Sequence, residues 1–337
     1  KEFSIREYTR IYSRLGISFD LYSGEKEQQS GCSTLISSLQ NNNLIINEGG
    51  TKLIDLSEFS LGKALLTKKD GTSLYLTRDI AAAISRFNEY NFTKMIYVVS
   101  SPQSYHFKQL FKILEISGCS WASKCEHVSF GMIEGMSTRK GEVVLLDDIL
   151  DEAKNRVMEK MQQDTKGKFK GILDPDTTAD NIAIAAIIIQ DLSSRKIKDY
   201  KFDWKRVTQF EGKTGSYLQF TYARLCGLER INKLAFSQDD DRFTDTSNLL
   251  EPEIQNLIFT LSKYSLILDK CLQDFEPVTL VNYVFDLAAI ISSCLTKFWI
   301  KDQPVDIAKS RALLYNCSKI VLGNALRLLG ITPVEQM

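Results

Sequence analysis

The chain has 337 residues, of which 44% are hydrophobic and 25% charged, and its 42 basic residues equal its 42 acidic residues. This length and composition are typical of a globular protein with two domains of ordinary size, and they exclude wholesale disorder. Seven cysteines without a CxxC pair argue against a disulfide framework or a common metal site, and no apolar run approaches the ~20 residues that an ordinary membrane span needs.

The first half of the chain predicts an α/β fold. Residues 1–60 mix strand-like and helical pieces, with a strand expected at 53–56. An alternation then follows, in the order strand 73–76, helix 77–90, strand 95–99, helix 105–117 and strand 127–133. Thr77 is expected to cap the first of these helices, and the apolar run 95–99 is typical of a buried parallel strand. The pattern predicts half of a doubly wound sheet, whose ligands bind at the carboxyl ends of the strands.

A glycine-bounded loop, Gly135–Gly141, follows the last of these strands. Glycine at both ends permits a tight turn and a close approach to a ligand. Arg139 and Lys140 supply charge-assisted donors and Ser137 supplies a hydroxyl, a combination that suits a polyphosphate. From these residues alone, a solvated basic turn between a strand and a helix is the alternative.

The second half predicts an all-helical bundle of four or five helices. The strand signal stops near Asp147, and 182–192 is apolar and long enough for a buried helix. Apolar stripes with a period of 3.6 residues are found at 217–231, 249–272, 278–298 and 307–329.

An α/β half with a phosphate-type loop, joined to a helical bundle, resembles a class I aminoacyl-tRNA synthetase. Residues 74–83 (LYLTRDIAAA) resemble the YxTRDIAA segment of arginyl-tRNA synthetases, and 127–141 (HVSFGMIEGMSTRKG) their HVxFGMVxGMSTRKG block, the local form of the KMSKS loop. Residues 210–224 (FEGKTGSYLQFTYAR) are similar to their FEGDTGPYLQYAHAR, and 324–337 match the end of their DALR-type anticodon-binding domain.

This resemblance implies part of a Rossmann-like class I catalytic domain over residues 1–165 and an all-α DALR-type anticodon-binding bundle over 166–337. The implied activity is that of an arginine–tRNA ligase. The carboxylate of arginine attacks the α-phosphate of ATP, which enters with Mg²⁺, and the arginyl group then passes to the terminal ribose of tRNA(Arg). No structural metal is expected.

The resemblance also implies roles for single residues. The guanidinium of arginine pairs with Tyr75 and Asp79, Gln103 binds its backbone end, and the departing pyrophosphate is neutralised by Ser137, Arg139 and Lys140. ATP contacts are expected at His106, Phe130, Gly131, Met132 and Met136, and tRNA contacts at Tyr217, Phe220, Arg224 and Met337.

Each of these roles has a structural alternative. Asp79 could be an acid in the first turn of a helix, Tyr75 a half-buried strand aromatic and His106 a structural histidine. The alternative for Phe220 is a place in the core of the bundle.

The chain departs from the family pattern in several places. It contains only two histidines, His106 and His127, and neither lies in the upstream HIGH signature of class I enzymes. We therefore expect this chain to be part of a longer protein, with crippled ATP chemistry when alone. In the bundle, Lys213 replaces the usual Asp, Tyr222 the usual His, and Leu295 an anticodon-stacking Tyr of some cytosolic members.

Two other functions fit parts of the sequence. One is a non-catalytic tRNA-binding relative that kept the bundle; the other is a cysteine-specific synthetase, which selects its substrate with a zinc site that we do not find here. Residues 274–277 and 300–304 resemble the animal mitochondrial branch, so we expect the mitochondrial matrix, with the cytoplasm as the alternative. We expect a monomer that does not associate with a membrane.

Overall fold

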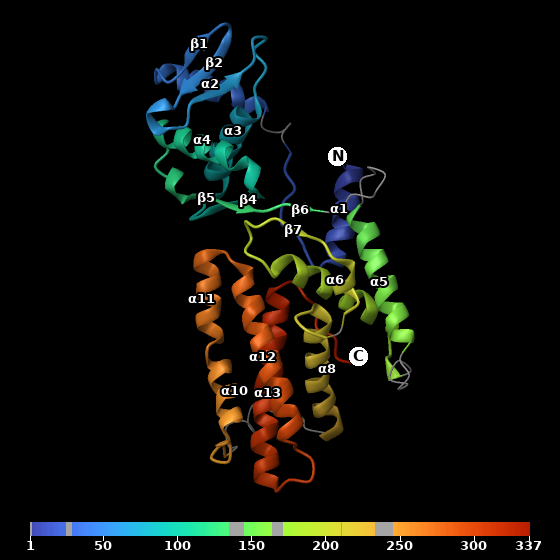
Figure 1. Ribbon diagram of the computed structural model, residues 1–337. Coiled ribbons are helices and arrows are strands. Elements are labelled where there is room, and N and C mark those ends of the chain that lie inside the picture. Colours follow the sequence, from blue (N-terminus) through green and yellow to red (C-terminus); the bar gives the residue numbers. More distant parts are fainter. Residues whose placement is uncertain (1, 25–28, 135–144, 164–170, 210, 233–244) are drawn as a thin grey trace. The chain divides into compact units, whose positions relative to one another are not determined.

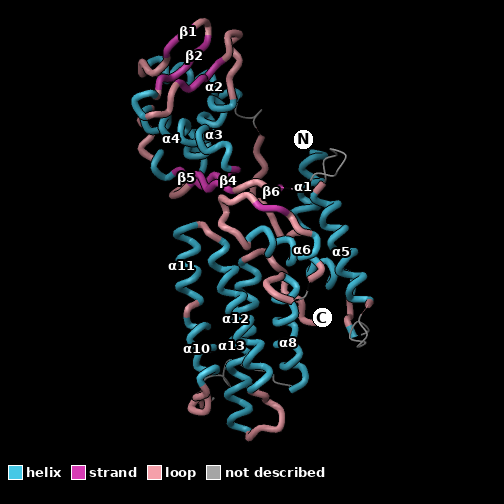
Figure 2. The backbone as a smooth tube through the Cα atoms, in the orientation of Figure 1, coloured by secondary structure: helices cyan, strands magenta, loops and turns pink. Residues whose placement is uncertain are grey.

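The computed structural model describes residues 2–24, 29–134, 145–163, 171–209, 211–232 and 245–337 (Figures 1 and 2). The chain forms two compact units, one of Phe19–Met132 and one of Lys1–Ser18 together with Ile133–Met337. Each unit has its own buried apolar core.

The unit Phe19–Met132 begins with helix α2 (Gln29–Asn41) and a three-stranded antiparallel sheet. The strands lie in the order β1 (Ile46–Glu48), β2 (Thr51–Asp55) and β3 (Lys63–Thr67). Gly49 and Gly50, at φ +56° and +87°, make the two-residue turn between β1 and β2, which needs two positive φ angles. β2 overlaps the strand expected at 53–56, which is thereby confirmed.

The rest of this unit alternates helices and strands in the expected order: α3 (Tyr75–Tyr90), β4 (Met95–Ser100), α4 (Ser104–Ile116) and β5 (Cys125–Phe130). β4 and β5 pair in parallel, with Tyr97 opposite His127, and α4 is the crossover between them. The ring of Tyr97 lies 5.1 Å from that of Phe107 and 5.7 Å from that of Phe111, so α4 covers one face of the pair. This parallel unit is the element that the α/β pattern predicts.

The strand expected at 73–76 is wrong. Ser73 forms a single bridge to Thr67, and α3 already begins at Tyr75 with Leu74 as its N-cap residue. Thr77 is no cap either, because its buried hydroxyl donates to the carbonyl of Leu66 at 2.6 Å. This contact with β3 is a tertiary interaction, which the local alternation of polar and apolar residues does not encode.

Burial of the strand 95–99 on both faces is also wrong. Ile96 and Val98 are 39% and 66% exposed, whereas Tyr97 and Val99 between them are partly buried. An apolar strand of this kind predicts two covered faces. In this structure, α4 covers only one of them.

The unit of Lys1–Ser18 and Ile133–Met337 is mainly helical. Its first elements are α1 (Glu2–Arg14), β6 (Ile133–Glu134), α5 (Leu146–Gln162), α6 (Pro175–Leu192), β7 (Tyr200–Lys201) and α7 (Trp204–Val207). β6 and β7 form a short parallel pair, so the strand expected over 127–133 is two strands, β5 and β6, and the strand signal does not stop at Asp147.

A bundle of long helices completes this unit: α8 (Gly215–Asn232), α10 (Pro252–Ser262), α11 (Tyr264–Asp274), α12 (Pro277–Lys297) and α13 (Val305–Leu328) (Figure 1). Their apolar stripes meet in one core, in which Leu218, Leu257, Leu287 and Leu322 have no exposed surface. Helical periodicity thus predicts the bundle correctly, except that the helix expected over 249–272 is broken at Lys263.

Helix α12 is long and apolar enough to cross a membrane, although the sequence analysis found no such segment. Over its 21 residues the mean hydropathy of the best window is 1.7, which satisfies the length and composition of a membrane span. Half of that window is buried inside the protein, where Val284, Leu287 and Ile291 belong to the bundle core. α12 is therefore best described as the central helix of a packed bundle.

Helix α1 is held against α5 and α6 by charge. Arg14 pairs with Asp180 at 2.7 Å and with Asp151 at 2.6 Å, and Arg10 pairs with Asp147 at 2.5 Å. The hydrogen bond to Asp180 raises the pKa of Arg14 further above its usual range. No described residue of α1 is buried, so these pairs rather than apolar packing fix its position.

Candidate functional site

Tyr75 and Asp79 lie on the first two turns of α3. The spacing of four residues places them on one face of the helix. Tyr75 is 66% exposed, and the guanidinium carbon of Arg78 lies 5.6 Å from the centroid of its ring. The side chain of Asp79 is 43% exposed. An accessible carboxylate beside an accessible aromatic ring is a suitable arrangement for binding a guanidinium group.

Asp79 already has a partner within this unit. The Nε2 atom of His106, in the first turns of α4, lies 2.7 Å from its Oδ2 atom. Gln103 is exposed in the short 3-10 turn Ser101–Gln103 that leads directly into α4. α3 and α4 pack together, so the turns that carry Asp79, His106 and Gln103 belong to neighbouring elements of the same unit.

His106 is the first of a series of ring contacts that runs through the unit. Its ring meets that of Phe107 edge-on, with centroids 5.4 Å apart, and Phe107 stacks on His127 at 4.5 Å. The Nε2 atom of His127 lies 2.9 Å from the carbonyl oxygen of Val99. The series therefore joins α3, α4, β5 and β4, and His127 has a structural role that its place in the sequence motif does not reveal.

The expected adenine-binding residues follow β5. Phe130 ends this strand and is 42% exposed, Gly131 is partly buried, and Met132 is 51% exposed. This is the carboxyl end of a parallel strand, where ligands of α/β folds bind. The other expected ATP and pyrophosphate contacts, at Met136, Ser137, Arg139 and Lys140, lie outside the described residues.

Burial also controls the ionisation of one neighbouring group. Burial among the rings of Phe107 and Phe111 raises the pKa of Tyr97 to about 12. The phenol therefore stays neutral above the pH at which an ordinary tyrosine ionises.

A second candidate site is a pocket of about 450 Å³ in the helical unit, between α8 and the C-terminal segment. Among its walls are Phe220, Arg224 and Met337, three of the four residues expected to contact tRNA. Phe220 is 37% exposed, and the guanidinium carbon of Arg224 lies 5.8 Å from its ring centroid. An accessible ring beside a guanidinium group is a combination that stacks nucleotide bases.

The C-terminal segment is fixed to α8 by hydrogen bonds. The side-chain amide of Gln219 donates to the carbonyl of Thr332 at 2.8 Å and accepts from the amide of Val334 at 2.9 Å. Arg230 donates to the carbonyl of Glu335 at 3.0 Å and also lines the pocket. These bonds hold Met337 at the pocket wall. The sequence analysis did not identify Arg230 as a pocket residue, because Arg230 follows the recognised motif 210–224 by six residues.

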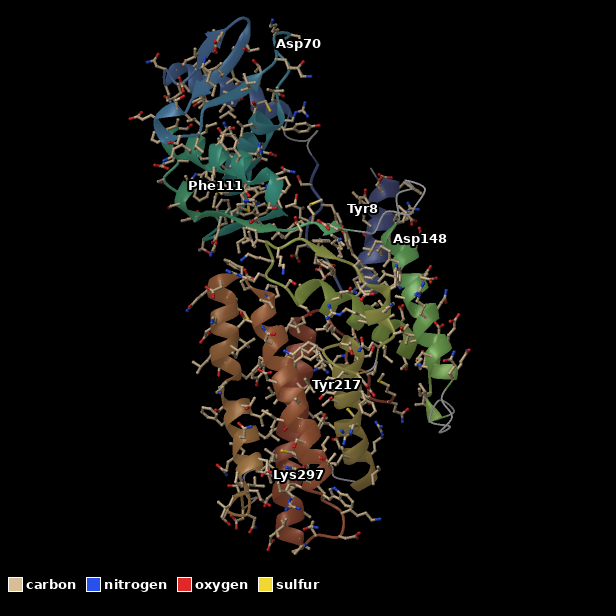
Figure 3. The ribbon with its side chains drawn as sticks, viewed as in Figure 1. Tyr8, Asp70, Phe111, Asp148, Tyr217 and Lys297 are labelled. Atoms are coloured by element: carbon tan, nitrogen blue, oxygen red, sulfur yellow. The ribbon has the colours of Figure 1, made fainter. Side chains whose placement is uncertain are left out.

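Tyr217 does not line this pocket. It lies on α8 within the bundle, and its hydroxyl is 3.3 Å from that of Ser292 on α12 (Figure 3). Its ring packs against the bundle core. The structure therefore gathers Phe220, Arg224 and Met337 and leaves Tyr217 apart.

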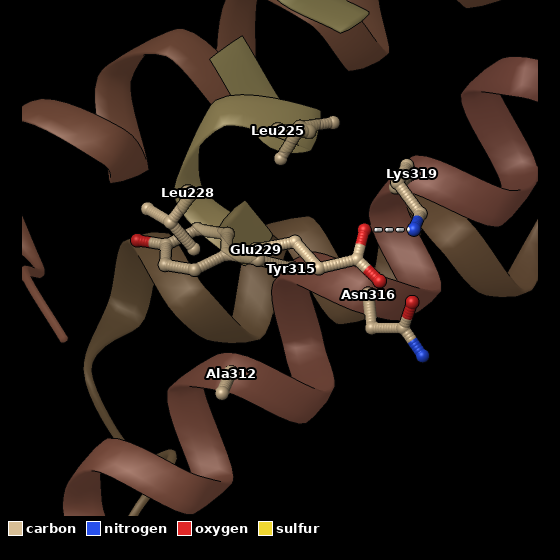
Figure 4. A pocket seen from close by; sticks show the side chains of 7 residues that line it. All are labelled: Leu225, Leu228, Glu229, Ala312, Tyr315, Asn316 and Lys319. Carbon is tan, nitrogen blue, oxygen red and sulfur yellow. Dashed lines mark hydrogen bonds and ion pairs between the residues drawn. The ribbon is translucent and has the colours of Figure 1, made fainter. Parts of the chain in front are cut away.

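A smaller cavity lies between α8 and α13 (Figure 4). Its volume of about 10 Å³ is close to the space of a single water molecule. The ion pair between Glu229 and Lys319 closes one side of it, and Leu225 and Tyr315 contribute to its walls. This is a packing defect within the bundle and has no room for a substrate. Among the described residues, no group of three or more His, Cys, Asp or Glu side chains could hold a metal ion.

Comparisons with known proteins identify the family of the chain. A family model described as "tRNA synthetases class I (R), catalytic domain" matches residues 1–204, and a model described as "DALR anticodon binding domain" matches residues 218–337. The fold and these two matches define the class: a class I aminoacyl-tRNA synthetase family with a helical anticodon-binding domain. The letter R specifies the amino acid: the chain belongs to the arginyl-tRNA synthetase family.

Individual relatives carry the same name. A protein of Dictyostelium discoideum named "Probable arginine–tRNA ligase, cytoplasmic" is 44% identical over the whole chain, which covers 56% of that protein. The mitochondrial arginine–tRNA ligase of Saccharomyces cerevisiae is 42% identical, again over the whole chain and 53% of its own length. The crystal structure of arginyl-tRNA synthetase from Plasmodium falciparum superposes with a TM-score of 0.85 at 25% identity, covering all of this chain and 57% of that one. The chain therefore spans little more than half the length of these relatives.

Proposed function

We propose that this chain is the part of an arginine–tRNA ligase that recognises the side chain of arginine and binds tRNA(Arg). The observation that carries the proposal is the pair of Tyr75 and Asp79, both accessible and one turn apart at the start of α3. A module that only binds tRNA has no use for a guanidinium site in its α/β unit. The pocket beside Phe220 supports the second half of the proposal.

In this proposal, Asp79 accepts hydrogen bonds from the guanidinium of arginine and Tyr75 supplies the face of its ring. Gln103 binds the backbone end of the amino acid from the turn that precedes α4. The two ends of the substrate are thus bound by α3 and by the start of α4, which pack against each other. This arrangement selects a long side chain with a planar cation at its end.

ATP is proposed to bind beyond β5, with its adenine at the backbone of Phe130, Gly131 and Met132. Ser137, Arg139 and Lys140 neutralise the departing pyrophosphate, so that catalysis consists of positioning and charge stabilisation. Mg²⁺ enters with the phosphates of ATP, because phosphate oxygens supply most of the ligands that this ion needs. The boundary at 165/166 between a catalytic and an anticodon-binding domain stays part of the proposal.

In the helical unit, we propose that Phe220 stacks on an unpaired base of tRNA(Arg) and that Arg224 contacts its edge or phosphate. Met337 contributes the apolar wall of the same pocket. Tyr217 acts through the bundle, given its contact with Ser292. We further propose a monomer in the mitochondrial matrix, with the cytoplasm as the alternative; light scattering and the location of a tagged full-length protein test these two points.

The test is arginylation of tRNA(Arg) by the complete parent protein with its native N-terminus. The variant Tyr75→Ala, Asp79→Ala should lose arginylation and retain tRNA binding. A matched control is Glu89→Ala, Tyr90→Ala, which removes an acid and a tyrosine from the exposed last turn of the same helix. The control should arginylate tRNA at the wild-type rate.

Two results would overturn the proposal. If the intact parent bound tRNA firmly but failed to arginylate it, the chain would belong to a tRNA-binding relative without ligase activity. If both double variants lost activity equally, α3 would matter for stability rather than for recognition of arginine.

A further inference from the structure

We infer that His106 is a positioning residue for the carboxylate of Asp79, and thereby sets the affinity for the guanidinium group of the amino-acid substrate. The inference rests on the proposed function and deepens it. It also replaces the nucleotide contact that the sequence resemblance implies for His106.

The geometry of the pair supports this role. The Nε2 atom of His106 lies 2.7 Å from Oδ2 of Asp79. A carboxylate offers only acceptors, so the proton of this hydrogen bond belongs to Nε2 of the imidazole. One oxygen of Asp79 is thus engaged by the protein, and the carboxylate plane is oriented with 43% of the side chain still exposed for a ligand.

His106 is itself firmly held, which a positioning residue must be. Its side chain is 24% exposed, and its ring lies edge-on to Phe107, of which only 5% is exposed. Phe107 in turn stacks on His127, whose Nε2 atom contacts the carbonyl oxygen of Val99. Rotation of the His106 ring therefore disturbs a packed series of rings, whereas Asp79 alone on the face of α3 has several accessible rotamers.

The location of His106 adds a second consequence. It follows Gln103 by three residues, in the first turns of α4. The hydrogen bond to Asp79 therefore ties the turn that recognises the backbone end of the substrate to the helix that recognises its guanidinium. The distance between these two ends selects the length of the substrate side chain, and errors of about 1 Å in such distances reduce rates by up to about a hundredfold.

The experiment compares His106→Gln, His106→Asn and His106→Leu in the complete parent enzyme. The side-chain nitrogen of Gln is as many bonds from the backbone as Nε2 of His, so it reaches Asp79, whereas that of Asn does not. We expect Asn and Leu to raise the KM for arginine on the order of tenfold, with the KM for ATP and kcat at saturating arginine within about threefold of wild type. Gln should restore the KM for arginine to within about threefold of wild type.

Other results overturn the inference. A rise in the KM for ATP with an unchanged KM for arginine would make His106 a nucleotide ligand. Equal losses in the Gln, Asn and Leu variants, or no loss in any of them, would remove the hydrogen bond from the explanation. An inactive wild-type parent would instead refute the proposed ligase function, so the two failures are distinguishable.

A second measurement does not depend on activity. In the complete parent protein, the ¹⁵N signals of the two imidazole rings of this segment are assigned by comparison with His106→Gln and His127→Gln. We expect the ring of His106 to carry its proton on Nε2, and Asp79→Asn to shift that signal. A proton on Nδ1 with Nε2 unprotonated, or a signal that Asp79→Asn leaves in place, would contradict the assigned hydrogen bond.

Discussion

Three glycine-to-alanine substitutions in the helical bundle should have three different effects on stability. Gly215 opens α8, where a Cβ atom would lie 2.3 Å from both the carbonyl carbon and the oxygen of Ala185 on α6. At Gly323 on α13, a Cβ atom would lie 2.8 Å from the ring of Tyr222. At Gly227, later in α8, the nearest atom is the tip of the Arg230 side chain at 3.8 Å. The obstacle is thus backbone, a buried ring and a flexible side chain, respectively.

The expected magnitudes follow from what can move. Backbone of α6 cannot rotate away from Gly215→Ala, so the helices must separate, which costs about 3 kcal/mol. The ring of Tyr222 can shift in part, and Gly323→Ala should cost about 1 kcal/mol after the gain in helix propensity. Gly227→Ala meets no obstacle and should stabilise the bundle by roughly 0.5–1 kcal/mol, the difference between Ala and Gly in a helix.

Thermal unfolding, followed by circular dichroism at a wavelength that reports helix content, ranks the three variants by stability. For a unit of this size, 1 kcal/mol changes Tm by about 2–4 °C. We therefore expect Gly215→Ala to lower Tm by about 6–12 °C, Gly323→Ala by about 2–4 °C, and Gly227→Ala to raise it by about 1–4 °C. A Gly215→Ala protein as stable as wild type would refute the close approach of α6 and α8. A Gly227→Ala protein less stable than Gly323→Ala would refute the packing assigned to those two glycines.

Three further predictions concern tRNA binding, pH and a buried hydroxyl. Phe220→Ala should weaken tRNA(Arg) binding about fivefold or more, because stacking of one base contributes roughly 1–3 kcal/mol. Filter binding at constant salt measures this, and a change under twofold would contradict the stacking role. The hydrogen bond from Arg10 lowers the pKa of Asp147 in the folded protein. The ionised carboxylate therefore stabilises the fold at pH values above its unfolded-state pKa of about 3.9, and this contribution disappears as the pH falls through the lower folded-state pKa. Asp147→Asn should flatten the decline of the urea midpoint below about pH 4, and an unchanged pH profile would argue against the pair. The hydroxyl of Ser216 is buried without a hydrogen-bond partner among the described residues, so Ser216→Ala should leave the urea midpoint unchanged or raise it, and a clear drop would reveal a partner.

The sequence predicts the helical bundle well because its helices are long and their apolar faces are periodic. α8, α12 and α13 begin and end within about two residues of the expected ranges. The break at Lys263 has no such signal, since the apolar stripe of α10 continues into α11 across it. Periodicity records which face is buried and does not record a change in helix direction.

The short elements around the proposed arginine site could not be predicted with the same success. Residues 73–76 alternate polar and apolar side chains as a strand does, yet Tyr75 and Leu76 are already helical. The start of α3 is fixed by the bond from Thr77 to Leu66, which joins residues 11 positions apart. Local propensity yields to such a contact when the helix start packs against a neighbouring strand.

The two histidines show where inference from a motif needs the structure. His127 lies in a segment that resembles the family and His106 lies between two such segments, and by residue type either could bind a phosphate, a carboxylate or nothing. His127 stacks on Phe107 and bonds to the carbonyl of Val99, so its neighbours account for it entirely as a structural residue. The ring of His106 also contacts Phe107, edge-on, but its Nε2 atom points to the accessible carboxylate of Asp79, which is 27 residues away in sequence. Because packing alone does not require a charged partner there, the pair with Asp79 is the contact that places His106 in the proposed arginine site rather than in the core.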